Sequence, residues 1–373
     1  MAGIYIHIPF CKQACHYCNF HFSTSLKQKE PLLQALLVEI ERQKDYLSGE
    51  QLESIYLGGG TPSLLSVKEL DLLFNQIQRF HKIANQAEIT LEANPDDLSR
   101  EQLKALRETP INRLSIGIQS FLEEDLRFMN RAHSAAEAEA CIDLALEQGF
   151  TALTVDLIYG TPTLSHAQWE QNLQKVFEKP IQHLSCYCLT VEPKTALDHF
   201  VNTGKAKPVD EEQAALQFER LIEASKVAGF EQYEISNFAR DGYYAVHNSN
   251  YWKGKKYLGI GPSAHSFNGE SRQWNIANNA QYIRSIQAGE LPHEVEHLDL
   301  DQRYNEYVMT GLRTIWGCEI SKIYGFSPAH ARHFKDKAQA FIQAGNMEEK
   351  EGNYCLTEAG RLLADHIAME LFV

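Results

Sequence analysis

The sequence has no long hydrophobic run and no surplus of positive charge. Because no stretch of about 18 apolar residues is present, we expect no membrane-spanning helix. The first ten residues, MAGIYIHIPF, lack the basic start and long apolar core of a secretory signal, so we expect a cytoplasmic protein. The 373 residues carry a formal net charge of −14 at pH 7. Proteins that bind nucleic acid need a basic surface to displace counterions, so we expect no nucleic-acid partner.

A paired cysteine framework is missing as well. Eight cysteines in a cytoplasmic chain of this length do not indicate disulfides. Cys11, Cys15 and Cys18 have the spacing CxxxCxxC, and no second pair follows to complete a zinc site. Such closely spaced thiolates suit an iron–sulfur cluster, with three reduced thiols in a loop as the alternative. Three ligands on a four-iron cluster leave one iron open to a small molecule. The other five cysteines are predicted to be buried apolar residues: Cys141, Cys186, Cys188, Cys318 and Cys355.

Short β-rich runs alternate with amphipathic helices from the start of the chain to about residue 190. Six such runs are predicted strands, and this alternation implies right-handed βαβ crossovers and a parallel sheet. Because six units fall short of the eight that close a TIM barrel, we predict a partial TIM-like (β/α)6 barrel for residues 1–190. A flat doubly wound sheet is the alternative. In both architectures, ligands gather at the carboxyl ends of the strands.

The pattern changes after residue 190. Residues 191–297 are predicted to form an extension that contains a glycine- and aromatic-rich stretch. Residues 298–373 read as helices with a small hairpin, which predicts a C-terminal helical, winged-helix-like domain. Since the protein is acidic, we expect this domain to act as a lid or packing unit and not to read DNA.

Glycines and polar residues stand where the predicted strands end. Residues 58–62, GGGTP, offer backbone N–H and C=O groups, and glycine permits their close approach to a ligand. Glu92, Gln119, Arg131 and Asp156 stand at or just after later strand ends. Taken singly, each is as consistent with a local cap as with a ligand contact. Their recurrence at successive strand ends predicts one common site.

These motifs closely resemble the radical S-adenosylmethionine superfamily. CxxxCxxC with Tyr17 before the last cysteine, followed by GGGTP, carries the resemblance. The phrases IYIHIPFC, NRLSIGIQSF and YEISNFA extend it to the branch of oxygen-independent coproporphyrinogen III oxidase and the HemW-type haem chaperones. The resemblance implies a 4Fe-4S cluster on Cys11, Cys15 and Cys18, with one or two molecules of exchangeable S-adenosylmethionine. The implied cofactor contacts are Tyr5, Tyr17, Gly59, Gly60, Thr61, Glu92, Gln119, Arg131 and Asp156.

Three features separate the two members of that branch. The oxidase has a further cysteine two places after its last cluster ligand, where this chain has Phe20. It also has an N-terminal extension, whereas a single predicted strand precedes Cys11 here. Residues 247–252, HNSNYW, match the HNxxYW motif associated with haem-binding HemW-type proteins. Neutral imidazole is a common axial ligand of haem iron, which makes His247 the candidate; a packing histidine is the alternative. His265 and His7 are less favoured, and His7 is expected to hydrogen-bond within the sheet.

Two functions of different classes are therefore in competition. The favoured function is that of a carrier, which binds haem and delivers it to an unidentified acceptor protein. The alternative is an enzyme that converts coproporphyrinogen III to protoporphyrinogen by oxidative decarboxylation. Phe20, the short start and the HNSNYW motif all favour the carrier. Transient association with a membrane is compatible with a chain that has no spanning segment.

Overall fold

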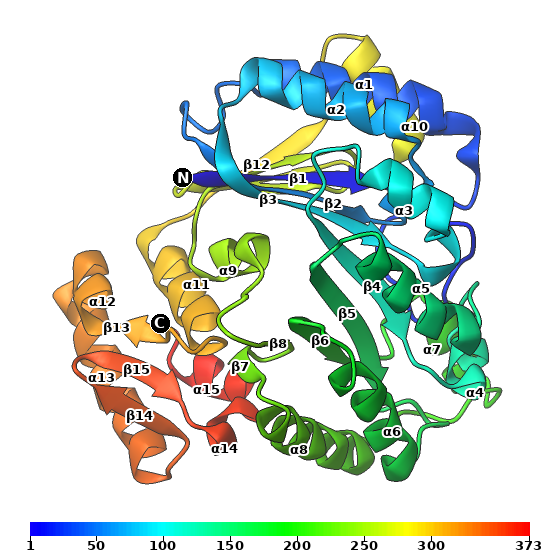
Figure 1. The fold of residues 1–373 in the computed structure, drawn as a ribbon. Coiled ribbons are helices and arrows are strands. Elements are labelled where there is room, and N and C mark those ends of the chain that lie inside the picture. Colours follow the sequence, from blue (N-terminus) through cyan, green and yellow to red (C-terminus); the bar gives the residue numbers. More distant parts are fainter.

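The computed structural model describes residues 1–373, and one curved sheet of twelve strands forms its centre (Figure 1). Its middle six strands are parallel and follow the chain order, and in Figure 1 they curve into an incomplete barrel. These strands are β1 (Ala2–Ile8), β2 (Leu52–Gly59), β3 (Ile83–Ala93), β4 (Arg113–Gln119), β5 (Ala152–Tyr159) and β6 (His183–Cys188). The predicted (β/α)6 architecture is confirmed.

Helices between these strands cover the outer face of the curved sheet (Figure 1). They are α1 (Lys29–Arg42), α2 (Val67–Phe80), α3 (Arg100–Leu106), α4 (Glu123–Phe128), α5 (Ala135–Glu147) and α6 (His166–Phe177), with short 3-10 turns η1 (Leu26–Gln28), η2 (Pro62–Leu64) and η3 (Pro95–Asp97). Three of them start with a capping box, in which Ser66, Ser134 or Ser165 accepts a hydrogen bond from the backbone three residues later. These boxes satisfy N–H groups that a helix start leaves without partners.

The two faces of the sheet differ in polarity because successive strand residues point to opposite sides. In β2, Ile55 and Leu57 are completely buried in a continuous core between the sheet and the helices. The intervening Ser54 and Tyr56 belong to the inner face, where they bond to polar partners on other elements. The outer face thus supplies the hydrophobic core, and the inner face is left for polar chemistry.

Residues 191–297 extend this same sheet at both edges. The order of strands is β12-β11-β10-β9-β1-β2-β3-β4-β5-β6-β8-β7, with β9 parallel to β1 and the other added pairings antiparallel. The elements are α7 (Ala196–Asn202), α8 (Glu211–Val227), β7 (Glu231–Glu234), β8 (Asn237–Ala239), α9 (Val246–Trp252), β9 (Tyr257–Ile260), β10 (His265–Phe267), β11 (Ser271–Asn275), α10 (Asn279–Gln287) and β12 (His293–His297). Strand pairing at both edges protects the central parallel strands from unwanted pairing with other chains.

The C-terminal part has a hydrophobic core of its own and a separate three-stranded sheet, β13-β15-β14. Its elements are α11 (Leu300–Leu312), β13 (Cys318–Glu319), α12 (Ile320–Phe326), α13 (Pro328–Gln343), β14 (Met347–Lys350), β15 (Asn353–Leu356), α14 (Glu358–Arg361) and α15 (Ala364–Glu370). The helices and the β14–β15 hairpin confirm the predicted winged-helix-like domain. Backbone hydrogen bonds from Ile235 to Arg313 and from Ile315 to Tyr233 attach it to the β7 edge of the large sheet.

The structure also bears on two further predictions, one about membrane-spanning helices and one about the five cysteines outside the loop. None of the helices is both long enough and apolar enough to cross a membrane. Cys141, Cys186 and Cys318 are buried as predicted, but Cys188 is exposed and Cys355 is half-buried. The prediction is wrong for Cys188 because β6 ends there, where the chain leaves the core.

Candidate functional site

The three predicted cluster cysteines lie on the loop that follows β1. Cys11, Cys15 and Cys18 are half-buried free thiols. The loop is held at two points, because the Cys11 N–H donates to the Ser23 carbonyl at 3.1 Å and the His16 N–H donates to the Met129 carbonyl at 3.0 Å. Burial raises the pKa of Cys18 to about 11, so its thiol keeps its proton until a metal displaces it.

Arg131 joins this loop to the ends of two strands. Its Nη1 donates to Cys15 Sγ at 3.3 Å, while Nη2 donates to Asn94 Oδ1 at 2.7 Å and to the Gly117 carbonyl at 2.8 Å. The Nε atom is buried without a hydrogen-bond partner. The charge of Arg131 opposes the rise that burial causes in the pKa of Cys11 and Cys18.

The glycine-rich segment packs against the first strand with no space for a side chain. The Gly60 N–H donates to the Ile8 carbonyl at 3.0 Å, and the Thr61 N–H donates to the Phe10 carbonyl at 2.7 Å. A Cβ on Gly60 would lie 2.6 Å from Ile8 O and 2.8 Å from Phe10 N and O. Gly59 has φ +102°, a conformation that favours glycine. This closely packed segment lies directly beside the strand that leads into the cysteine loop.

Glu92 reaches the same segment from the end of β3. Its Oε2 accepts the Gly59 N–H at 3.0 Å, and its Oε1 accepts the Tyr56 hydroxyl at 2.7 Å. Burial raises the pKa of Glu92. Sequence reasoning did not single out Tyr56, although its position two residues before Gly58 places both on the inner face of β2.

Gln119 and Arg131 meet at Gly117. A Cβ on Gly117 would lie 2.9 Å from Gln119 Nε2 and 3.2 Å from Arg131 Nη2. Gln119 has φ +65°, and the pairing of β4 with β5 is irregular at this point. Left-handed backbone at a non-glycine residue is uncommon and is often found at functional sites.

Asp156 projects from β5 into the same inner face. Its carboxylate accepts the Ser115 hydroxyl, with Oδ2 at 3.2 Å. Burial, and then the nearby charge of Glu92, raise the pKa of Asp156 to about 7. Two carboxyl groups that share a secluded face cannot both ionise easily, so one of them holds a proton near neutral pH.

Replacing Asp156 by asparagine is expected to change how stability depends on pH. The folded chain holds a proton at Asp156 that the unfolded chain releases, so the free energy of unfolding falls as pH rises from about 4 to about 7. Asp156→Asn lacks this loss and should be more stable than the parent by about 1–3 kcal/mol at pH 8, with a smaller difference at pH 5. Urea unfolding at both pH values tests this, with the exposed Asp71→Asn as control. A difference between parent and Asp156→Asn that is equal at both pH values would contradict it.

Tyr5 and Tyr17 flank these groups from two sides. The Tyr5 hydroxyl donates to His7 Nδ1 at 3.1 Å, and its ring stacks on Tyr56 with centroids 6.0 Å apart. The bond to Tyr5 lies within β1, as predicted for His7. The His7 Nε2–H donates to the His21 carbonyl at 2.9 Å, on the loop after the cysteines. Tyr17 packs against a small apolar cluster beside the cysteine loop, and burial raises the pKa of its hydroxyl.

His247 lies near the start of α9, a short helix within the curve of the sheet (Figure 1). Its Nδ1 is 2.9 Å from Ser54 Oγ, and its ring stacks on Tyr56 at 5.0 Å between centroids. Glu88 accepts the backbone N–H groups of Val246 and His247, each at 2.9 Å. Burial lowers the pKa of His247 to about 4, so the imidazole is neutral. The sequence gives no signal for Ser54 or Glu88, since only the strand register brings them to α9.

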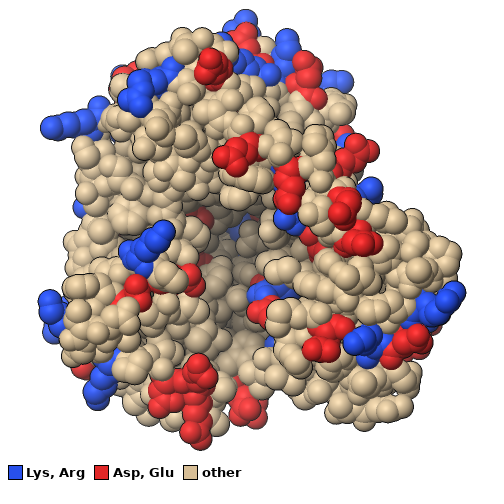
Figure 2. Space-filling model, turned by 180° about the vertical axis from the view of Figure 1, so that it is seen from behind, with Lys and Arg blue, Asp and Glu red and all other residues tan.

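The predicted residues therefore form two connected groups. One group surrounds the cysteine loop at the carboxyl ends of the strands, and the other is His247 with its partners further along the inner face. Tyr56 links them, because it bonds Glu92 and stacks on His247. Seen from behind, the surface is hollowed near the centre of the molecule (Figure 2).

The donor atoms are of the type that holds an iron–sulfur cluster. Three free thiols stand on one short loop, and in such a cluster each iron takes its own thiolate. Gly60 packs directly on backbone atoms of Ile8 and Phe10, which fixes the GGGTP segment against the strand that leads into the cysteine loop.

Comparisons with known proteins agree over the whole chain. The family model of the radical SAM superfamily matches residues 5–176, and that of the HemN C-terminal domain matches residues 298–363. Heme chaperone HemW of Bacillus subtilis strain 168 is 32% identical over 374 residues, with 98% of both chains covered. Heme chaperone HemW of Escherichia coli K12 is 31% identical over 377 residues, with 100% of this chain and 98% of the relative covered.

A solved structure shares the fold. Coproporphyrinogen III oxidase (HemN) from Escherichia coli superposes with a TM-score of 0.85 at 24% identity, and the match covers 100% of this chain and 90% of that one. At this identity the likeness concerns the fold alone.

Proposed function

The chain belongs to the HemW family of the radical SAM superfamily, and we propose on that basis that it is a haem chaperone, which binds haem and passes it to an acceptor protein. Full-length similarity to two proteins named as heme chaperones carries this proposal. The acceptor is a protein whose identity nothing in the site specifies.

Cys11, Cys15 and Cys18 would hold a 4Fe-4S cluster, and the Gly59–Thr61 segment with Glu92 would hold S-adenosylmethionine. When bound, the cluster supplies an open iron for this ligand and an electron for its reduction. Arg131 would hold the cysteine loop against the ends of β3 and β4 through its bonds to Asn94 and Gly117. Tyr56 would keep the Glu92 carboxylate oriented.

His247 is the proposed ligand of the haem iron. Its low pKa keeps the imidazole neutral, which is the form that coordinates a metal. The bond between Nδ1 and Ser54 Oγ leaves Nε2 without a hydrogen-bond partner in the structure. Histidines that bind metals commonly have their other ring nitrogen held in this way, because the second bond fixes the ring's orientation.

The charge of the inner face favours a carrier over the oxidase. Three carboxylic acids, Glu88, Glu92 and Asp156, project from its strands. Two buried cations also lie at the site, and both already have partners. Arg113 is engaged by Glu88 at 3.5 Å and by Thr154 at 2.8 Å, and Arg131 by Cys15 at 3.3 Å and Asn94 at 2.7 Å. Decarboxylation requires a propionate of coproporphyrinogen to enter the barrel, where both cations are already bonded to other groups. Haem bound with its propionates towards water avoids this conflict.

Haem binding is expected to depend on His247. His247→Ala should weaken haem binding by about 10–100-fold, because the iron loses the imidazole ligand that Ser54 orients. Titration of anaerobic holoprotein with haem, followed by absorbance, measures the change. The exposed His297→Ala is the matched control. Equal affinities of parent and His247→Ala would remove His247 from the haem site.

The enzymatic alternative is tested separately. Reduced holoprotein is incubated with S-adenosylmethionine and coproporphyrinogen III under argon, and the products are analysed for protoporphyrinogen. We expect none beyond background. Repeated turnover to decarboxylated product would overturn the chaperone proposal in favour of the oxidase.

A further inference from the structure

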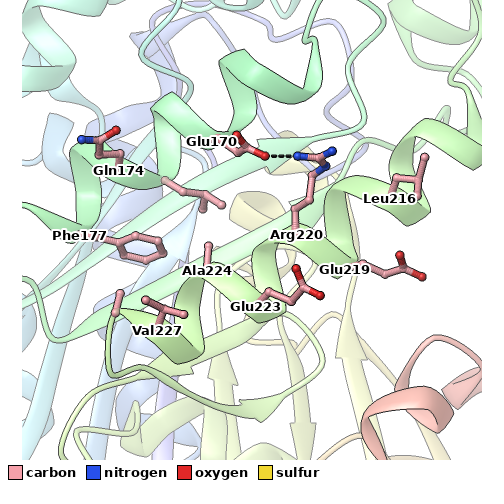
Figure 3. Close-up of a pocket in the computed structure, with 11 residues that line it drawn as sticks. Glu170, Gln174, Phe177, Leu216, Glu219, Arg220, Glu223, Ala224 and Val227 are labelled. Atoms are coloured by element: carbon pink, nitrogen blue, oxygen red, sulfur yellow. Dashed lines mark hydrogen bonds and ion pairs between the residues drawn. The ribbon is translucent and has the colours of Figure 1, made fainter.

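A surface groove lies between α6 and α8 (Figure 3), two helices on the outer side of the barrel (Figure 1). Its volume is about 690 Å³. Its floor includes Leu173 and Phe177 of α6 and Ala224 of α8, with Ala228 just beyond that helix. No residue of the candidate site contributes to it, so the function proposed above does not account for it.

Large apolar side chains at this groove are left in water. Val227 is 90% exposed, which is the highest value among the exposed large hydrophobic residues of the chain. Leu216, three turns earlier on α8, is 42% exposed. Single exposed apolar residues are common on proteins, but these two line one groove, which the Arg220–Glu170 ion pair crosses between them.

The rim of the groove has a surplus of negative charge. Arg220 is paired with Glu170 across the two helices, as the dashed line in Figure 3 shows. Glu219 and Glu223 also line the groove, one turn apart on α8, and neither has an ion-pair partner. A ligand that covers the apolar floor would therefore meet two unpaired carboxylates at the edge, and cations on the ligand would complement them.

The dimensions of the groove suit a helix. The lining residues of α8 run from Leu216 to Val227, and Ala228 follows, a length of roughly 18 Å at 1.5 Å per residue. Ala224 and Ala228 are small and one turn apart, so a third helix can approach closely between α6 and α8. We propose that this groove docks an amphipathic helix of about three turns from a partner protein, with its apolar stripe on the floor and Lys or Arg side chains beside Glu219 and Glu223.

Other occupants fit the charges less well. A second copy of this chain bound through the same groove would place Glu219 and Glu223 opposite themselves, and like charges across an interface oppose association. An anionic membrane surface would meet the same carboxylates. The complementary partner is basic, and this proposal does not depend on what the cluster or haem does.

The test uses a dye-labelled helical peptide of about 14 residues with a leucine stripe flanked by lysines, and the same peptide with glutamates in place of lysines. Fluorescence anisotropy with the anaerobic holoprotein measures binding. We expect the parent protein to bind the lysine peptide more tightly than the glutamate peptide. The lysine peptide should bind at least 10-fold more weakly to Val227→Asp and to Leu216→Asp than to the parent. Its binding to the double variant Glu219→Gln/Glu223→Gln should be several-fold weaker than to the parent.

Two matched controls accompany these variants. Leu72→Asp changes a comparably exposed leucine on α2, and Glu211→Gln/Glu212→Gln removes two charges from the start of α8. Neither should alter peptide affinity. Unchanged cluster absorbance in each variant shows that the fold is intact.

Each of the following results would overturn the proposal. The lysine peptide fails to bind, both peptides bind equally well, or the groove variants bind as the parent does. A dimer in sedimentation that Val227→Asp dissociates would show that a second copy occupies the groove. Binding to anionic lipid vesicles that is lost in Val227→Asp would assign the groove to a membrane.

Discussion

Cys15→Ala is expected to lose its iron–sulfur cluster. Anaerobic reconstitution should load the parent with about four iron atoms per chain and the variant with almost none. The physical reason is that each of three irons depends on one thiolate. Cys15 is also the sulfur that Arg131 contacts at 3.3 Å, so the variant leaves a buried guanidinium without that partner. Iron and sulfide analysis with visible absorbance measures the outcome.

Cys188→Ala is the control for this experiment, because Cys188 is an exposed thiol at the end of β6 and not on the cysteine loop. It should keep full iron content. An intact cluster in Cys15→Ala would refute the assignment of the three ligands, and with it the part that the cluster has in the proposed function. Haem binding measured on the same sample shows whether the cargo site depends on the cluster.

Gly60→Ala is expected to weaken S-adenosylmethionine binding by about 100-fold or more. The new Cβ would lie within 2.8 Å of three backbone atoms of Ile8 and Phe10, so the backbone must move to relieve the clash. A shift of about 1 Å in a binding segment commonly costs that much. Equilibrium dialysis of the ligand against anaerobic holoprotein measures the affinity, and cluster absorbance reports separately whether the cysteine loop is disturbed.

Gly325→Ala is the matched control, because a Cβ there meets no atom within 4 Å and the residue lies within helix α12. Alanine in a helix should stabilise the protein slightly and leave ligand affinity unchanged. An unaltered affinity in Gly60→Ala would show that the GGGTP segment does not bind S-adenosylmethionine. That outcome would leave the haem proposal standing, since His247 lies in the other group of the site.

Phe20 shows how one position contributes to the choice between functions. Its side chain is 67% exposed beside the cysteine loop, and it stands where the oxidase resemblance calls for a further cysteine. The inner face adds an independent reason, because its cations Arg113 and Arg131 are already bonded to other groups of the protein. The first reason is readable in the sequence, whereas the second required the strands to be placed side by side.

The sequence by itself determined the features that depend on near neighbours in the chain. The six βα units follow from hydrophobic periodicity, helix starts such as Ser66 from local capping, and the cysteine loop from spacing within eight residues. The grouping of the motif residues at one edge of the sheet was predictable as well, because the carboxyl ends of parallel strands converge.

Only the tertiary structure decided which distant residues meet. Tyr56 bonds Glu92, 36 residues away in the chain, and stacks on His247, 191 residues away. Glu88 accepts the N–H of Val246 at the start of α9, 158 residues away. The strands added outside the six parallel ones, such as β9, which joins β1 in parallel, were likewise not predicted. The physical reason is that strand register and sheet order arise from long-range packing, which a local pattern of polar and apolar residues does not specify.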